Sequence, residues 1–186
     1  MLVLALTACG ESEWTGDDAQ VTTLGINKDG KVREIIVEEF AESYYNIDDL
    51  RKQFEEEIDA YNSAAGGDKR ITLKELKQVG SVVRSCSDYL SVSDYTSFTK
   101  EPLYYGTLRQ ARLRGFEISQ KIRAAGGGEY LISEKDDELH VIFTDGHDHI
   151  VTPYKIIACT EGVKIVSDKE ADFTGTEGRS AVLLAK

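Results

Sequence analysis

The chain contains 186 residues, of which 22 are Lys or Arg and 33 are Asp or Glu, so its formal net charge is −11 and its pI is about 4.8. This balance argues against nucleic-acid binding, which needs a basic face to neutralise phosphates, and against direct electrostatic binding to anionic lipid. It favours a soluble monomer. Hydrophobic residues make up 41% of the chain, which is enough for the core of one ordinary domain.

The N-terminus is a short apolar run that ends in Leu6-Thr7-Ala8-Cys9. This pattern resembles the lipobox of bacterial lipoproteins, in which an aliphatic residue and two small residues precede a cysteine. The resemblance implies that residues 1–8 are a signal segment that is removed. It also implies that Cys9 carries a diacylglyceryl group, whose two acyl chains hold the protein stably on the extracytoplasmic face of the cell membrane. Because no basic residue precedes the run, we expect the true start to lie upstream.

The rest of the chain divides into a tether and a folded part. Residues 9–20 are polar and predict a flexible tether. Residues 21–186 predict a single domain, with two lobes dividing near 126–128 as the alternative. The glycines at 126–128 are followed by Glu129-Tyr130 rather than by the Lys-Ser or Lys-Thr of a phosphate-binding loop, so they predict a flexible connection.

The first half of the domain predicts two pairs of strands around one long helix. Asn27-Lys28-Asp29-Gly30 has turn-forming side chains and a glycine for positive φ, between two runs of strand-forming residues. Apolar residues at helical spacing follow Asn46, which is a favourable N-cap. The predicted elements are strands over 21–26 and 32–37, a helix over 44–62, and strands over 70–77 and 81–89.

Short helices and then strands are predicted for the rest of the chain. Ser91 and Thr107 are suitable N-caps, and they open helices over 91–98 and 107–113. A third helix is predicted over 116–125. The last 58 positions predict strands over 130–133, 139–144, 150–151, 154–159, 163–166 and 180–184, with a hairpin turn at Thr160-Glu161-Gly162. Because short connections require antiparallel pairing, the fold class is α+β, with an antiparallel sheet, one long amphipathic helix and a β-rich C-terminal half.

The order of these features is similar to that of a group of lipoproteins from Gram-positive bacteria. The resemblance rests on Asn27-Lys28-Asp29-Gly30-Lys31-Val32, on Glu39-Phe40, on the helix from Tyr44-Tyr45 to Ala60-Tyr61-Asn62, and on Tyr105-Gly106-Thr107 with Ala111 and Gly115. It implies a cell-surface location. It brings no catalytic residues to this chain.

The chain's three histidines form the first candidate site. His140, His147 and His149 lie within ten positions, beside Asp145, and imidazole is a frequent metal ligand. His147 and His149 alternate, so they share a face of an extended chain. These four residues are the candidate metal ligands, and a solvated turn is the alternative. No other cofactor is indicated.

A basic stretch forms the second candidate site. Arg109, Arg112 and Arg114 stand out in an acidic chain, and guanidinium groups suit an anionic wall polymer or a carboxylated ligand. The alternative is pairing of these arginines with nearby acids at a helix end. If Cys9 is lipidated, Cys86 and Cys159 remain, and they are either a disulfide or two buried free thiols.

The sequence therefore predicts a lipid-anchored extracytoplasmic protein with a binding or structural role at the cell envelope. Its expected partners are the membrane, through the anchor, and a cell-wall polymer or envelope protein. The alternative is an envelope metalloenzyme or hydrolase that uses His140, His147 and His149. The chain lacks the Gly-x-Ser-x-Gly pattern that marks one large class of hydrolases.

Overall fold

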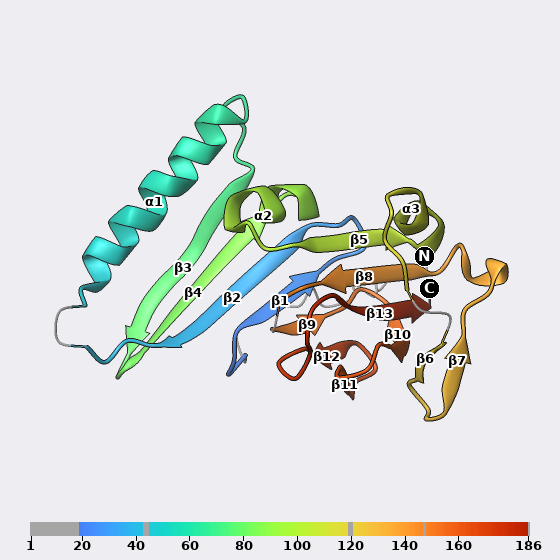
Figure 1. Cartoon of the computed structure of the whole chain (residues 1–186). Coiled ribbons are helices and arrows are strands. Elements are labelled where there is room, and N and C mark those ends of the chain that lie inside the picture. The colour runs from blue at the N-terminus through green and yellow to red at the C-terminus, as the bar shows by residue number, and fades with distance from the viewer. Residues whose placement is uncertain (1–18, 43–44, 119–120, 147, 186) are drawn as a thin grey trace, which may run out of the picture.

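A computed structural model describes residues 19–42, 45–118, 121–146 and 148–185 (Figure 1). In these ranges the chain forms three α-helices, one 3-10 helix and thirteen strands arranged in two sheets, which confirms the α+β class and the β-rich C-terminal half. The helices are α1 (Ile47–Ala64), α2 (Val92–Thr99), α3 (Leu108–Leu113) and the 3-10 helix η1 (Glu134–Asp136).

The first sheet has seven strands, and its members come from both halves of the chain. In spatial order they are β11 (Lys164–Ser167), β12 (Glu170–Asp172), β9 (His149–Val151), β1 (Thr23–Ile26), β2 (Val32–Glu39), β4 (Val82–Tyr89) and β3 (Ile71–Val79). All neighbours pair antiparallel except β1 and β9, which are parallel.

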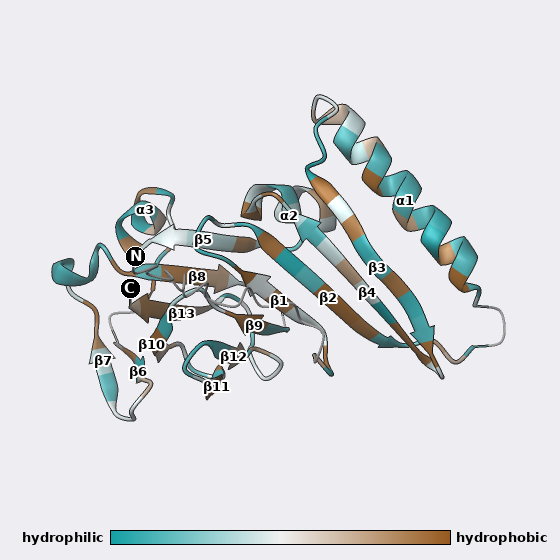
Figure 2. Cartoon of the chain, turned by 180° about the vertical axis from the view of Figure 1, so that it is seen from behind, coloured by the Kyte–Doolittle hydropathy of each residue, from teal (hydrophilic) through white to brown (hydrophobic). Residues whose placement is uncertain are grey.

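The second sheet has six antiparallel strands. In spatial order they are β5 (Leu103–Thr107), β8 (His140–Thr144), β13 (Ser180–Ala185), β10 (Lys155–Cys159), β6 (Lys121–Ala124) and β7 (Glu129–Leu131). One apolar core joins the two sheets, since Leu24 and Ile150 of the first sheet pack in the same cluster as Ile142 and Leu184 of the second. Figure 2 shows the hydrophobic colouring of β13 and the largely hydrophilic colouring of α1.

Local sequence signals account for most of the element boundaries. The Asn27 side chain accepts hydrogen bonds from the backbone N–H groups of Asp29 and Lys31, and Gly30 has a φ of 79°, so the predicted β1–β2 turn is confirmed. The predicted caps are also confirmed: Asn46 accepts from the first turn of α1, and Ser91 and Thr107 cap α2 and α3.

Two predictions about the second half are wrong. The helix expected over 116–125 is replaced, in its described part, by strand β6, because β6 pairs with β10 and with β7 and buries Ile122 in the core of the second sheet. Residues 126–128, expected as a flexible connection, form the turn of the β6–β7 hairpin, with Gly127 and Gly128 at positive φ.

The hairpin expected around Thr160-Glu161-Gly162 is also wrong, because the strands on either side of this turn do not pair with each other. Strand β10 belongs to the second sheet and β11 to the first, so the chain crosses between sheets at this turn. Strands β5 and β12 were not predicted. β12 is only three residues long, and its pairing with β9 and β11 is a property of the tertiary fold rather than of its own sequence.

Asp94 joins three elements around one carboxylate. Its side chain is 5% exposed, and it accepts hydrogen bonds from Arg70 at 2.8 and 3.2 Å, from the Ser91 hydroxyl at 2.6 Å and from the Tyr61 hydroxyl at 3.2 Å. Burial alone would raise the pKa of Asp94, but the hydrogen bonds from Arg70 and Ser91 outweigh it and hold this pKa below its ordinary value. The carboxylate thereby fixes the C-terminal part of α1 against α2 and the start of β3.

Helix α1 lies along the edge strand of the first sheet and satisfies part of its backbone. The Asn62 amide donates to the carbonyl of Ile71 and accepts from the N–H groups of Arg70 and Ile71, at 2.9 to 3.0 Å. One turn from the other end of the helix, Arg51 donates to the carbonyl of Leu76. Because an open strand edge invites pairing with other chains, these contacts protect β3.

Replacing Asp94 by Ala should destabilise the domain by about 3 kcal/mol, because Arg70 and Tyr61 lose their shared acceptor in a partly buried site. Urea unfolding at pH 7 measures this difference. As a control, Lys52→Ala removes an exposed pair with Glu56 at 3.8 Å and should change stability by less than about 0.5 kcal/mol. Equal effects of the two substitutions would contradict the role given to Asp94.

Candidate functional site

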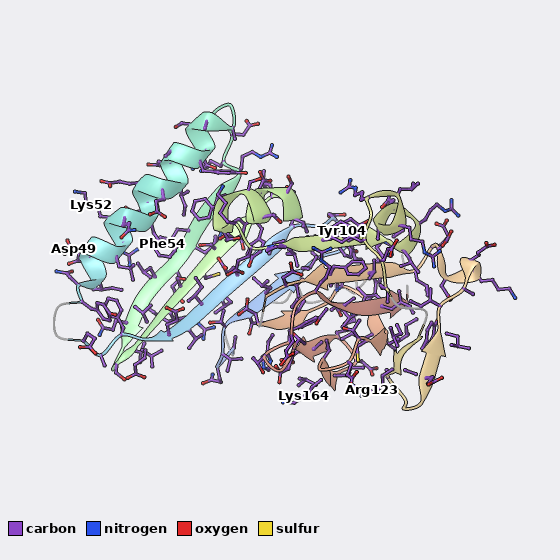
Figure 3. The ribbon with its side chains drawn as sticks, in the orientation of Figure 1. Asp49, Lys52, Phe54, Tyr104, Arg123 and Lys164 are labelled. Atoms are coloured by element: carbon purple, nitrogen blue, oxygen red, sulfur yellow. The ribbon has the colours of Figure 1, made fainter. Side chains whose placement is uncertain are left out.

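A half-open cavity of about 220 Å³, lined by apolar and polar residues, lies between α1 and the first sheet. The helix contributes Leu50 and Phe54, and the sheet contributes Ile36, Leu76 and Val83. In Figure 3, Phe54 lies on the side of α1 that faces the sheet, whereas Asp49 and Lys52 lie on the outer side. The cavity is therefore bounded by the apolar stripe that the helical periodicity predicts.

The cavity exists because α1 packs closely on the sheet at one end only. Ile58, near the C-terminal end, is the buried residue of the helix at 6% exposure, whereas Leu50 and Phe54 are only half-buried. At the N-terminal end, the rings of Phe40 and Tyr45 stack with centroids 4.6 Å apart and close one side of the hollow. The apolar side chains of this half of α1 thus face space rather than tightly packed neighbours.

The mouth of the cavity is acidic. Glu38 and Glu39, at the end of β2, line it together with the apolar residues, and Ser85 supplies a hydroxyl from β4. Ser85 is itself buried at 2% exposure, so its hydroxyl lies on the floor of the hollow rather than at the rim.

A buried carboxyl group, that of Glu34, lies on the same face of the sheet, two residues before Ile36 on β2. Residues two apart on a strand share a face, so Glu34 follows Ile36 toward the core, and its cross-strand partner is Ser87. The Tyr89 hydroxyl donates to Glu34 at 2.6 Å. Burial raises the pKa of Glu34 from 4.5 to about 7; the Tyr89 hydrogen bond opposes this shift, and repulsion by the Glu101 and Asp148 carboxylates adds to it.

A second hollow of about 280 Å³ lies on the opposite face of the first sheet, beside His149 and Glu170. The His149 ring is held between two carboxylates, with its Nδ1 3.1 Å from Glu170 and its Nε2 3.7 Å from Asp172. The chain's own Ala19, Gln20 and Val21 form much of the wall. Both ring nitrogens thus face acids of β12.

The predicted metal ligands are not brought together. Asp145 pairs with Arg179 at 3.2 Å, and His140 packs between Tyr105 and Tyr154 on the second sheet, with ring centroids 5.3 and 5.0 Å away. His149 is in the other sheet, and His147 lies outside the described residues. Over the part of the chain that the structure describes, no group of three or more His, Cys, Asp or Glu side chains is placed to hold a metal ion.

The arginines of α3 interact with neighbouring acids. Arg109 lies 2.6 Å from Glu138 and 3.7 Å from Asp137, and Arg112 also bonds Asp137. Arg114 instead lies over the Tyr104 ring, 5.6 Å from its centroid. For Arg109 and Arg112 the structure therefore favours the alternative of local pairing at a helix end over an anion-binding group.

Cys86 and Cys159 are both buried free thiols. Of the two alternatives, the structure therefore favours free thiols over a disulfide; Cys86 is on β4 of the first sheet and Cys159 on β10 of the second. Burial raises the pKa of both thiols, which makes them poor nucleophiles. Cys9, the predicted lipidation site, lies outside the described residues.

Comparison with known proteins gives no relative: no protein family, no curated protein and no solved structure matches this chain. In the described ranges, no helix has the length and apolar character needed to cross a membrane. The cavity was not predicted from the sequence. The signal that points to it is the apolar stripe of α1, which is longer than the stretch of helix that the sheet covers closely.

Replacing Glu34 by Gln should flatten the pH dependence of stability. The pKa of Glu34 is higher in the folded state than in the unfolded state, so the protonated group stabilises the fold. This stabilisation is fully present below about pH 4.5 and is lost as the pH rises through 7. The free energy of unfolding should fall by about 3 kcal/mol over that range. Gln keeps an acceptor for Tyr89 and cannot ionise. Urea unfolding at pH 5 and pH 8 should show wild type losing stability relative to Glu34→Gln, and parallel pH profiles would contradict the assignment.

Proposed function

We propose that this chain is a lipid-anchored protein of the cell envelope whose domain binds an apolar group of its partner in the cavity beneath α1. The observation that carries the proposal is the cavity itself, to which both helix and sheet contribute apolar side chains. A dry cavity of about 150 Å³ is known to accept benzene, and drug-sized ligands need roughly 300 Å³ or more. A volume of 220 Å³ suits one aromatic ring or one short alkyl group.

The proposed location rests on the sequence pattern at the N-terminus. Leu6-Thr7-Ala8-Cys9 supplies the lipid attachment site, and the polar residues that follow it would hold the domain away from the membrane. An acidic domain on a tether stays clear of an anionic membrane surface, which keeps its cavity accessible.

A binding role is favoured over hydrolysis because the titratable groups of the candidate metal site have other partners. His149 faces Glu170 and Asp172, Asp145 pairs with Arg179, and both internal thiols are buried. In the described part of the chain these groups do not converge on a common point where a water or a substrate would be activated.

Lipidation of Cys9 should be required for attachment to the membrane. In a bacterial host that expresses the protein behind a complete signal segment, a radioactive fatty acid should label wild type and leave Cys9→Ser unlabelled. The variant should also leave the membrane fraction, because its anchor is missing. Label that persists on Cys9→Ser would remove the lipoprotein assignment.

Filling the cavity should abolish binding of a neutral aromatic probe. We expect indole to bind wild type and to shift NMR signals of residues around Leu50, Ile36 and Val83. Leu50→Trp places a larger ring in the hollow and should weaken indole binding at least tenfold.

The matched control is Leu113→Trp, the same substitution at a position on α3 that is 82% exposed. It should bind indole as wild type does. Indole that fails to bind wild type, or that binds Leu50→Trp equally well, would contradict the proposed cavity function.

A further inference from the structure

The charge around the cavity mouth indicates what kind of partner carries the apolar group. We infer that the cavity receives one large apolar side chain of a basic polypeptide segment. This inference rests on the proposed function and adds the chemical class of the partner.

Negative charge is concentrated in the segment that runs from the end of β2 through α1. Residues 38–64 contain nine acidic and two basic residues, so this segment carries seven of the eleven net negative charges of the chain. The acids are Glu38, Glu39, Glu42, Asp48, Asp49, Glu55, Glu56, Glu57 and Asp59. The other 159 residues are nearly neutral by comparison, so the acidity is a local feature of this end of the molecule.

The two cations of this segment neutralise little of that charge. Arg51 donates to the carbonyl of Leu76, and Lys52 pairs with Glu56 at 3.8 Å on the outer face of α1. Glu38 and Glu39, which line the mouth, form no salt bridge with any cation in the described ranges. A cationic partner would therefore meet two exposed acids at the rim of the hollow.

The extent of the acidic surface favours a polypeptide over a small amine. Helix α1 has 18 residues and is roughly 27 Å long, whereas the cavity accepts a single ring. A small amine bound at the mouth would neutralise only Glu38 and Glu39, since charges further away than about 8 Å are screened at physiological ionic strength. Several Lys or Arg residues spaced along a chain could meet both Glu38 and Glu39 at the rim and the exposed acids on the surface of α1.

An aromatic pair lies at the mouth beside the acids. Tyr45 is 46% exposed and stacks on Phe40, and both residues line the hollow together with Glu38 and Glu39. A partner with an apolar side chain between basic residues would therefore meet apolar and acidic groups next to each other. Apolar insertion gives affinity, and the acids give orientation and a faster encounter.

The test uses three peptides and four forms of the full-length protein. The peptide acetyl-Lys-Arg-Phe-Lys-Arg-amide should bind wild type. Its Phe-to-Ser analogue and its analogue with Glu at the four basic positions should each bind at least tenfold more weakly. The measurement is titration by NMR or calorimetry in about 0.15 M salt, and affinity should fall as the salt concentration is raised.

The protein variants separate charge from insertion. The double variant Glu38→Gln, Glu39→Gln should bind the basic peptide about tenfold more weakly, a loss larger than any change in its binding of neutral indole. The double variant Glu161→Gln, Glu177→Gln makes the same charge change at two exposed positions of the C-terminal half, and it should behave as wild type. Leu50→Trp should lose both the peptide and indole.

The outcomes distinguish this inference from the proposed function. If indole binds but the acidic peptide binds as well as the basic one, the partner class is wrong and the apolar site stands. If the basic peptide binds equally to Leu50→Trp, or equally to Glu38→Gln, Glu39→Gln, insertion at this mouth is wrong. If neither indole nor any peptide binds, the inference and the proposed function both fail.

Discussion

The arrangement of the first sheet and its helix depends on the carboxylate of Asp94. Hydrogen bonds from Arg70, Ser91 and Tyr61 converge on it, so one buried charge ties the C-terminal part of α1 to α2 and to the start of β3. Because α1 is fixed firmly at this end, the opposite end does not need close packing to stay in place. Arg51, bonded to the edge of β3, sets the separation there. The apolar hollow is a consequence of this one-sided attachment.

The sheet face beneath α1 changes character along its length. Next to the second sheet it carries Leu24 and Val32 in the apolar core, and the neighbouring position on β2 carries the Glu34 carboxyl with its Tyr89 partner. Further out, Ile36 and Ser85 line the hollow. A buried acid adjacent to a cavity weakens packing and supplies a polar boundary, which limits how deeply an apolar group can enter.

Local sequence signals made much of the secondary structure predictable. The pairing between segments that are distant in the chain could not be predicted from the sequence. The Asn27 turn and the Asn46 and Ser91 caps act through neighbouring backbone atoms, so the sequence alone reveals them. In contrast, the β9 pairing with β1, the crossing between sheets after Cys159 and the partners of His149 depend on residues far away in the chain. The cavity depends on helix placement, which no local pattern encodes.

The interleaving of the two sheets has a consequence for how the protein is made. Strand β1 has β9 as its neighbour, and β9 is followed outward by β12 and β11, so the first sheet stays incomplete until residues beyond 167 are present. Such long-range pairing slows folding, because the entropy cost of closing the loop comes before the stabilising contacts form.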